Sequence, residues 1–382
     1  MGFIDRYRKF AELSDEEIRA GFRAQADEQL RQDLERVEVL DLSITTPAEM
    51  PHPAVAAAIS FAGKRALNRS GDPLSGELRD LLAGVSGAER GNVAVGPGAT
   101  GLLGALATAV LAEGDVLATP WPSYPLYPLL AAAAGADAVP IETERTPEAL
   151  AAAVASNPST KMLVVCNPND PDGSLMPAPA IKELRNLLPE SVLLVLDEAL
   201  VDYAGAEHIS ATASLAQDSE GIVLVRTMSK AWGLAGLRVG WLIGGDDSRE
   251  LFARMSPLLG VSGPSEAGAI AALKDAPDTP AQRAREVRRE IARLRKLLRG
   301  TSIEIGETAT NFVWIRIPGL SADDVADRVL ASGVKVMNGS SVGADTHVRA
   351  TLRSDETATE RLAEGLLAAA MAADGQARSP AD

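Results

Sequence analysis

Short apolar runs recur through the middle of the chain and alternate with longer stretches of helical spacing. Between residues 92 and 245 these runs read NVAVG, DVLATPW, DAVPI, KMLVVCN, SVLLVLDEA, GIVLVRT and RVGWLIG. They lack the alternation of apolar and polar positions that marks a strand with one solvated face, so they are typical of strands buried on both faces. Such strands, separated by helices, predict an α/β domain with a mainly parallel central sheet.

The pattern changes towards the carboxyl terminus. A long charged helix is predicted over residues 280–299, and the strand-like segments SIEI, NFVWIRI, VKVMN and HVRATL follow it. This second set predicts a smaller α+β domain. At the other end, residues 15–37 predict one amphipathic helix, which Ser14 and Glu17 open in a capping-box pattern.

A chain of 382 residues is too long for one ordinary core, so two domains are expected. The predicted division is an N-terminal helical arm over 1–45, a large domain over 46–265, a small C-terminal domain over 266–372 and a tail over 373–382. The tail ends in GQARSPAD, which is polar and contains Gly and Pro, and we expect it to be disordered.

Composition narrows the classes of partner. The net charge of −15 is spread over both halves of the chain, and a negative surface repels nucleic acid and anionic lipid, so we expect neither as a partner. The first 22 residues carry charge every few positions, which argues against a secretory signal or a membrane span. The single cysteine, Cys166, fits a cytoplasmic location, and the three histidines show no zinc-site spacing, so no metal site is expected.

The segment VRTMSKAWGLAGLRVGW carries the strongest chemical signal. A buried-type strand ends in Thr227. Ser229 and Lys230 come soon after it, and Arg238 lies eight residues beyond the lysine. The hydroxyls and the arginine can hold a phosphate group while Lys230 forms a Schiff base with an aldehyde. The alternative is an ordinary surface lysine at a strand end.

Two other apolar strands end in polar residues. VLLVLDEA presents Asp197 at the carboxyl edge of the sheet, where a carboxylate can keep a pyridine nitrogen protonated. The alternative for Asp197 is a helix or turn cap. KMLVVCNPNDPDG presents Asn167, whose amide can donate to a phenolic oxygen, although asparagine in such a turn often serves only the turn.

Two weaker signals lie upstream. In VGPGATG, residues 95–101, backbone N–H groups can cradle a phosphate at a helix start. The segment lacks the Gly-Lys-Ser/Thr ending of a Walker loop and the glycine spacing of a dinucleotide site. In WPSYPLY, Tyr124 can stack on a flat ring, and the alternative is plain packing beside the prolines.

Taken together and in this order, these segments resemble the class I/II aminotransferases of pyridoxal 5′-phosphate (PLP) fold type I. The resemblance covers about residues 40–370 and is strongest to the histidinol-phosphate aminotransferase-like branch. NPNDPDG is similar to that family's NPNNPTG, LDEA to its DEAY, and TMSKAWGLAGLRVG to its Schiff-base segment almost letter for letter. The resemblance implies a PLP-dependent homodimer that moves an amino group between an L-amino acid, or a related amine, and a 2-oxo acid.

The resemblance also implies residue roles. Lys230 would be the Schiff-base lysine and proton shuttle, and Asp197 the partner of the pyridine nitrogen. Arg349, in HVRATLRS, would bind the substrate α-carboxylate with two hydrogen bonds, and its alternative is a solvated charge at a strand edge. The remaining contacts to the ring and the phosphate would come from Asn167, Tyr124, Thr227, Ser229, Arg238 and the backbone of Ala99 and Thr100.

The chain departs from the family pattern at several positions. The DEAY tyrosine is Leu200, although an aromatic follows at Tyr203, and the family's RYPDP reads RSGDP over residues 69–73. The segment NGSSVGADT, residues 338–346, has small residues where a larger one would confine the substrate. These departures argue against histidinol phosphate as the substrate. They leave open a PLP-dependent decarboxylase or lyase on the same fold and, as a further alternative, a non-catalytic PLP-binding module.

Overall fold

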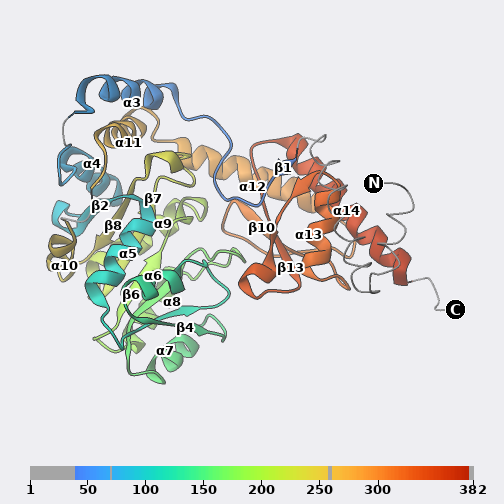
Figure 1. The fold of residues 1–382 in the computed structure, drawn as a ribbon, viewed down its shortest axis with the longest axis horizontal. Helices are drawn as coiled ribbons and strands as arrows, with labels where there is room; N and C mark the ends of the chain where they lie inside the picture. The colour runs from blue at the N-terminus through green and yellow to red at the C-terminus, as the bar shows by residue number, and fades with distance from the viewer. Residues whose placement is uncertain (1–38, 69–70, 257–259, 378–382) are drawn as a thin grey trace, which may run out of the picture.

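The computed structural model describes residues 39–68, 71–256 and 260–377. The helix predicted over 15–37 and the last residues of the tail, 378–382, lie outside the described residues. Two lobes are visible, one around a large sheet and one around a smaller sheet, and helix α12 (Thr279–Leu297) runs across both (Figure 1).

The large lobe is built on a seven-stranded sheet with the order β2-β8-β7-β6-β5-β3-β4. Strand β8 runs antiparallel to both of its neighbours, and the other pairs are parallel, which confirms the mainly parallel sheet. The strands span Val93–Gly96 (β2), Val116–Pro120 (β3), Asp137–Ile141 (β4), Thr160–Cys166 (β5), Leu193–Asp197 (β6), Ile222–Thr227 (β7) and Gly240–Gly244 (β8).

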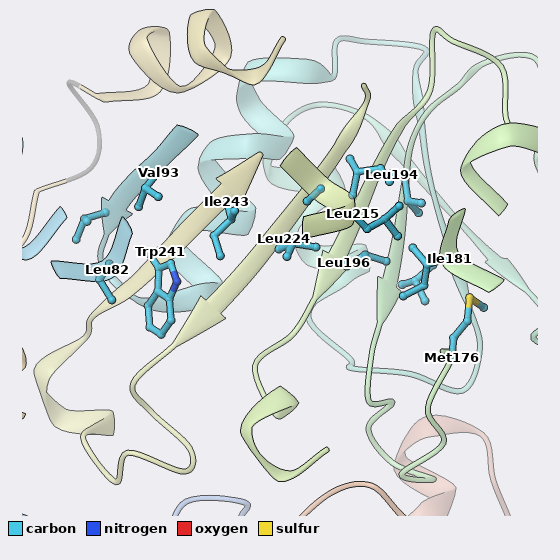
Figure 2. Packing of buried hydrophobic residues seen from close by; sticks show 14 of the residues in the cluster. Leu82, Val93, Met176, Ile181, Leu194, Leu196, Leu215, Leu224, Trp241 and Ile243 are labelled. Atoms are coloured by element: carbon cyan, nitrogen blue, oxygen red, sulfur yellow. The ribbon is translucent and has the colours of Figure 1, made fainter. Parts of the chain in front are cut away.

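Each central strand buries both of its faces. In β6, Leu194 and Leu196 join one core cluster while Val195 joins the other, so successive side chains point to opposite sides of the sheet. Figure 2 shows the first cluster, in which Leu196, Leu224 and Ile243 from neighbouring strands lie in a row. Burial on both sides explains why the strands read as continuous apolar runs.

Helices cover the two faces of the sheet in separate groups. One group packs residues into the first cluster: α3 (Pro53–Ala66), α4 (Gly76–Ser86), α7 (Pro147–Ala155), α8 (Ala178–Leu187), α9 (Ala206–Asp218) and α11 (Gly263–Asp275). The other group supplies the cluster on the opposite face: α5 (Gly98–Val110), α6 (Tyr127–Ala133) and α10 (Ser248–Met255).

The small lobe contains an antiparallel sheet in the order β12-β13-β10-β9, with helices α13 (Ala322–Ala331) and α14 (Glu356–Ala377) packed on each other. Its strands span Glu304–Ile305 (β9), Phe312–Arg316 (β10), Met337–Asn338 (β12) and His347–Thr351 (β13). A separate parallel pair joins β1 (Leu40–Asp41) to β11 (Val334–Lys335). Residues 40–42, which the sequence assigns to a helical arm, therefore belong to the small lobe, where Leu42 is part of the core.

Two further boundaries differ from the sequence prediction. Helix α11, assigned to the small domain from residue 266 onward, packs along α3 in the large lobe (Figure 1). Gly268 permits this close approach, because a Cβ there would lie 2.8 Å from Cγ1 of Ile59. Helix α14 runs to Ala377, into the predicted disordered tail, and it is rich in alanine, which has a high helix propensity.

Candidate active site

A cavity opens at the carboxyl edge of the large sheet, where β5, β6 and β7 end and α5 begins. Strands that run in the same direction end at the same edge, so polar residues far apart in the sequence meet there. All but two of the predicted site residues line this cavity, namely Ala99, Thr100, Tyr124, Asp197, Thr227, Ser229, Lys230 and Arg238. The two exceptions are Asn167 and Arg349.

One end of the cavity is a cradle for an anion. Arg238 Nη1 lies 3.4 Å from Ser229 Oγ, which lies 2.9 Å from Thr227 Oγ1. Helix α5 begins at Gly98, and a Cβ on that glycine would lie 2.5 Å from Nη2 of Arg238, so a larger residue would displace the guanidinium. A helix amino terminus, a guanidinium and two hydroxyls all favour a bound phosphate.

A buried carboxylate lies at the end of β6, in another part of the cavity wall. Asp197 is 3 % exposed, and its carboxylate accepts hydrogen bonds from the Tyr127 hydroxyl at 2.8 Å and from the Ala199 N–H at 3.1 Å. Burial raises the pKa of Asp197 above its usual value, although these hydrogen bonds and the Lys230 charge act in the opposite direction. A carboxylate held this way is well suited to receive a cationic N–H group.

Two tyrosines follow β3: Tyr124 lies in the loop, and Tyr127 is the first residue of α6. Tyr124, the predicted stacking residue, lines the cavity, and its ring meets that of Tyr127 edge to face with centroids 5.6 Å apart. Tyr127 fixes Asp197, a role that the sequence analysis missed. The motif WPSYPLY contains both tyrosines, and only the path of the turn decides which one faces the carboxylate.

Lys230 is held by the N-terminal segment of the small lobe. Its ammonium donates to the Thr45 hydroxyl, and the backbone carbonyl of Thr45 accepts from Asn311 Nδ2 at 2.9 Å. Burial lowers the pKa of the Lys230 amine, which favours its neutral, nucleophilic form. Sequence reasoning missed Thr45, because a contact between residues 185 positions apart leaves no local signal.

The turn after β5 departs from the prediction. The side chain of Asn167 is committed to the backbone of Met176, since Nδ2 donates to its carbonyl at 3.0 Å and Oδ1 accepts from its N–H at 2.7 Å. Asn167 does not line the cavity; Asp170, three residues later, does. The ring-oxygen role assigned to Asn167 is therefore corrected: its amide closes the turn. The signal for Asp170 was present in NPNDPDG, where it replaces an asparagine of NPNNPTG.

Arg349 is buried next to that turn. It is 8 % exposed, which excludes the alternative of a solvated strand-edge charge. Its Nη1 forms an ion pair with Asp170, its Nη2 donates to the Ser43 carbonyl at 2.6 Å, and its Nε has no partner. The guanidinium also lies over the Phe312 ring, 5.1 Å from the centroid. Arg349 is therefore adjacent to the cavity, with Asp170 as its contact to the cavity wall.

Neither Leu200 nor Tyr203 brings a phenol into the cavity. Leu200 lines the cavity and is 3 % exposed, whereas Tyr203 packs in the small-lobe core with a buried hydroxyl that has no partner. Tyr203 therefore does not supply the cavity with the missing phenol. Residues 69–70, at the start of the RSGDP segment, lie outside the described residues.

No group of three or more His, Cys, Asp and Glu side chains is arranged to hold a metal ion among residues 39–68, 71–256 and 260–377. Within the same ranges, no helix combines the length and the apolar character needed to span a membrane.

Comparison with known proteins gives consistent results. The family model "Aminotransferase class I and II" matches residues 37–366. An aromatic amino acid aminotransferase of Thermobifida fusca is 35 % identical over 75 % of this chain and 79 % of its own length. A histidinol-phosphate aminotransferase of Moorella thermoacetica is 32 % identical over 75 % of each chain.

Solved structures resemble the fold over nearly its whole length. The histidinol-phosphate aminotransferase of Sinorhizobium meliloti, in complex with pyridoxal-5′-phosphate, has a TM-score of 0.79 at 27 % identity and covers 90 % of this chain and 94 % of its own. A double mutant of Thermus thermophilus aspartate aminotransferase has a TM-score of 0.78 at 25 % identity, with 92 % and 95 % covered.

Proposed function

The chain belongs to the class I and II aminotransferase family and is a PLP-dependent aminotransferase, and we propose that the cavity around Lys230 is its catalytic centre. The observation that carries this proposal is the combination, in one cavity, of a buried lysine, an anion cradle at the start of α5 and a buried carboxylate at the end of β6.

The residues fit the cofactor. Arg238, Ser229 and the amino terminus of α5 would hold its phosphate, and Gly98 leaves the space that the cradle needs. The Asp197 carboxylate, held by hydrogen bonds from Tyr127 and Ala199, would keep the proton on the ring nitrogen. When bound, PLP supplies an electron sink for the negative charge that develops on the substrate α-carbon.

The protein's own residues would divide the remaining work. Lys230 would attach the cofactor and, once the substrate amine has freed its side chain, would hold and move the proton of the substrate α-carbon. Thr45 accepts a hydrogen bond from the Lys230 amine and would orient it during that transfer. Tyr124 would pack on the ring, and Arg349 would bind the substrate carboxylate.

The proposed amino donors are aromatic L-amino acids, with a 2-oxo acid as acceptor. The curated relatives from Thermobifida fusca and Mycobacteroides abscessus carry the name aromatic amino acid aminotransferase at 35 % and 32 % identity. The segment 338–346 does not line the cavity, so its small residues do not bear on this choice of donor.

We further propose that the chain acts as a homodimer in the cytoplasm. Large apolar side chains are exposed in and around α3, among them Phe61 at 61 % and Leu67 at 76 %, and a second copy would cover them. The only cysteine, Cys166, is buried and free, which suits a reducing compartment. Light scattering of the purified protein distinguishes a dimer from a monomer.

The activity is tested with PLP-loaded protein, L-phenylalanine and 2-oxoglutarate. The proposal predicts equal amounts of glutamate and phenylpyruvate. Release of CO₂ or ammonia in place of glutamate would assign the cavity to a decarboxylase or a lyase, and the absence of turnover with a broad amino-acid panel would favour a binding module.

A further inference from the structure

The ion pair between Asp170 and Arg349 occupies the group that is proposed to bind the substrate carboxylate. Only 12 % of the Asp170 side chain and 9 % of the Arg349 side chain are exposed. Nη1 of the guanidinium donates to the Asp170 carboxylate and Nη2 donates to the Ser43 carbonyl. Each terminal nitrogen therefore already has a protein acceptor. Nε is buried without any partner, and its N–H is one of three guanidinium donors that these two bonds leave unused.

The charges of the pair cancel where a substrate carboxylate would bind. A guanidinium recognises a carboxylate through two parallel N–H donors, and here Asp170 uses part of that fork. A second carboxylate must displace Asp170 or lie beside it, and two like charges repel strongly in a buried site. The two charges of the pair also act in opposite directions on the pKa of Lys230. Burial lowers this pKa, the Asp170 charge raises it and the Arg349 charge lowers it.

We propose that Asp170 is a specificity-determining residue that competes with the substrate α-carboxylate for Arg349. This proposal rests on the proposed function. The competition weakens the binding of amino acids relative to amines that lack a carboxylate. An asparagine at this place, as in NPNNPTG, carries no charge and would leave the Arg349 charge uncompensated. The site therefore favours amines with a carboxylate over amines without one less strongly than a buried arginine free of Asp170 would.

The test is a binding measurement that does not depend on turnover. PLP-loaded wild type and Asp170→Asn are titrated calorimetrically with 3-phenylpropanoate, which has a carboxylate and no amine, and with the neutral 3-phenylpropanamide. Asp170→Asn should bind the carboxylate on the order of tenfold more tightly, since one charge-assisted hydrogen bond is worth at least that factor, and the amide within about twofold of wild type.

Two controls isolate the effect. Asp172→Asn alters a carboxylate of the same turn that bonds to Ser174 and does not line the cavity, so it should leave both affinities unchanged. In an Arg349→Gln background, adding Asp170→Asn should produce no gain, because the residue acts through Arg349. Asp170→Ser gives a second neutral variant if the asparagine protein does not fold.

The possible results separate this proposal from the proposed function. Equal or weaker carboxylate binding by the neutral variants, or the same gain in the Arg349→Gln background, would overturn the role of Asp170. Amino transfer from L-phenylalanine is followed in the same preparations. Its absence in every one of them would overturn the proposed function, while the carboxylate affinities still decide the role of Asp170.

Discussion

Replacing Asp197 by asparagine changes the charge of the site with little change in shape. We expect the substitution to change the free energy of unfolding in opposite directions with and without cofactor. In the cofactor-free protein, burial penalises the charged carboxylate, as its raised pKa indicates. The hydrogen bonds from Tyr127 and Ala199, 2.8 and 3.1 Å long, offset only part of that cost. We therefore expect cofactor-free Asp197→Asn to be about 1–2 kcal/mol more stable than wild type at pH 7, a fraction of the several kcal/mol that burying an ion costs.

The sign of this effect depends on pH. The pKa of Asp197 in the folded protein lies above its ordinary value of 3.8, so the folded state binds the proton more tightly than the unfolded state. The protonated Asp197 therefore makes its full contribution to the unfolding free energy of wild type below about pH 4. That contribution is lost as the pH rises through the pKa of Asp197 in the folded protein. The stability difference from Asp197→Asn should be small near pH 4 and fully developed at neutral pH.

With PLP bound, wild type should become more stable to unfolding than Asp197→Asn. The charged ring N–H compensates Asp197 in wild type, and the asparagine variant loses a charge-assisted hydrogen bond worth about 1.5–3 kcal/mol. Its affinity for PLP should fall by roughly 10- to 150-fold. Saturating PLP should accordingly raise the unfolding free energy of wild type more than that of the variant.

Urea unfolding between pH 4 and 8, with and without PLP, measures both effects. Tyr127→Phe is the matched control, because it removes one hydrogen bond to Asp197 and keeps the charge. A cofactor-free Asp197→Asn protein that is less stable than wild type at pH 7, together with unchanged PLP affinity, would refute the proposed pairing of Asp197 with the cofactor.

Two other substitutions test single contacts. Arg349→Lys keeps the charge and loses the planar fork, so carboxylate-bearing substrates should bind about 1.5–3 kcal/mol more weakly while PLP affinity stays the same; equal KM values for both proteins would exclude the role. Leu200→Tyr brings a phenol to the cavity wall, where a hydrogen bond to the cofactor's ring oxygen should lower the pKa of the Lys230–cofactor linkage, each unit corresponding to about 1.4 kcal/mol. Superimposable absorbance–pH titrations would mean that the phenol does not reach the ring.

The sequence was sufficient to predict the large sheet and most of the cavity wall. Runs such as VLLVLD are apolar on both faces of the strand, so the strands were recognisable, and parallel strands necessarily bring Asp197 and Thr227 to one edge. Lys230 comes three residues after the end of β7 and Arg238 two residues before β8, so local chain geometry sets their place.

The remaining features depend on tertiary contacts that local pattern does not encode. Within NPNDPDG, the path of the turn decides that Asn167 bonds to Met176 while Asp170 reaches the cavity. The hydrogen bond from Lys230 to Thr45 joins the two lobes, and the packing of α11 along α3 depends on Gly268, which looks like any other small residue in an alanine-rich helix.

Chemical trapping decides whether Lys230 carries the cofactor. The PLP-loaded protein is reduced with borohydride, digested and mapped by mass spectrometry. We expect one modified lysine, Lys230, because it is buried in the cavity beside the anion cradle and its pKa is lowered. A cofactor adduct on another lysine, such as Lys161 or Lys335, with Lys230 unmodified, would contradict it.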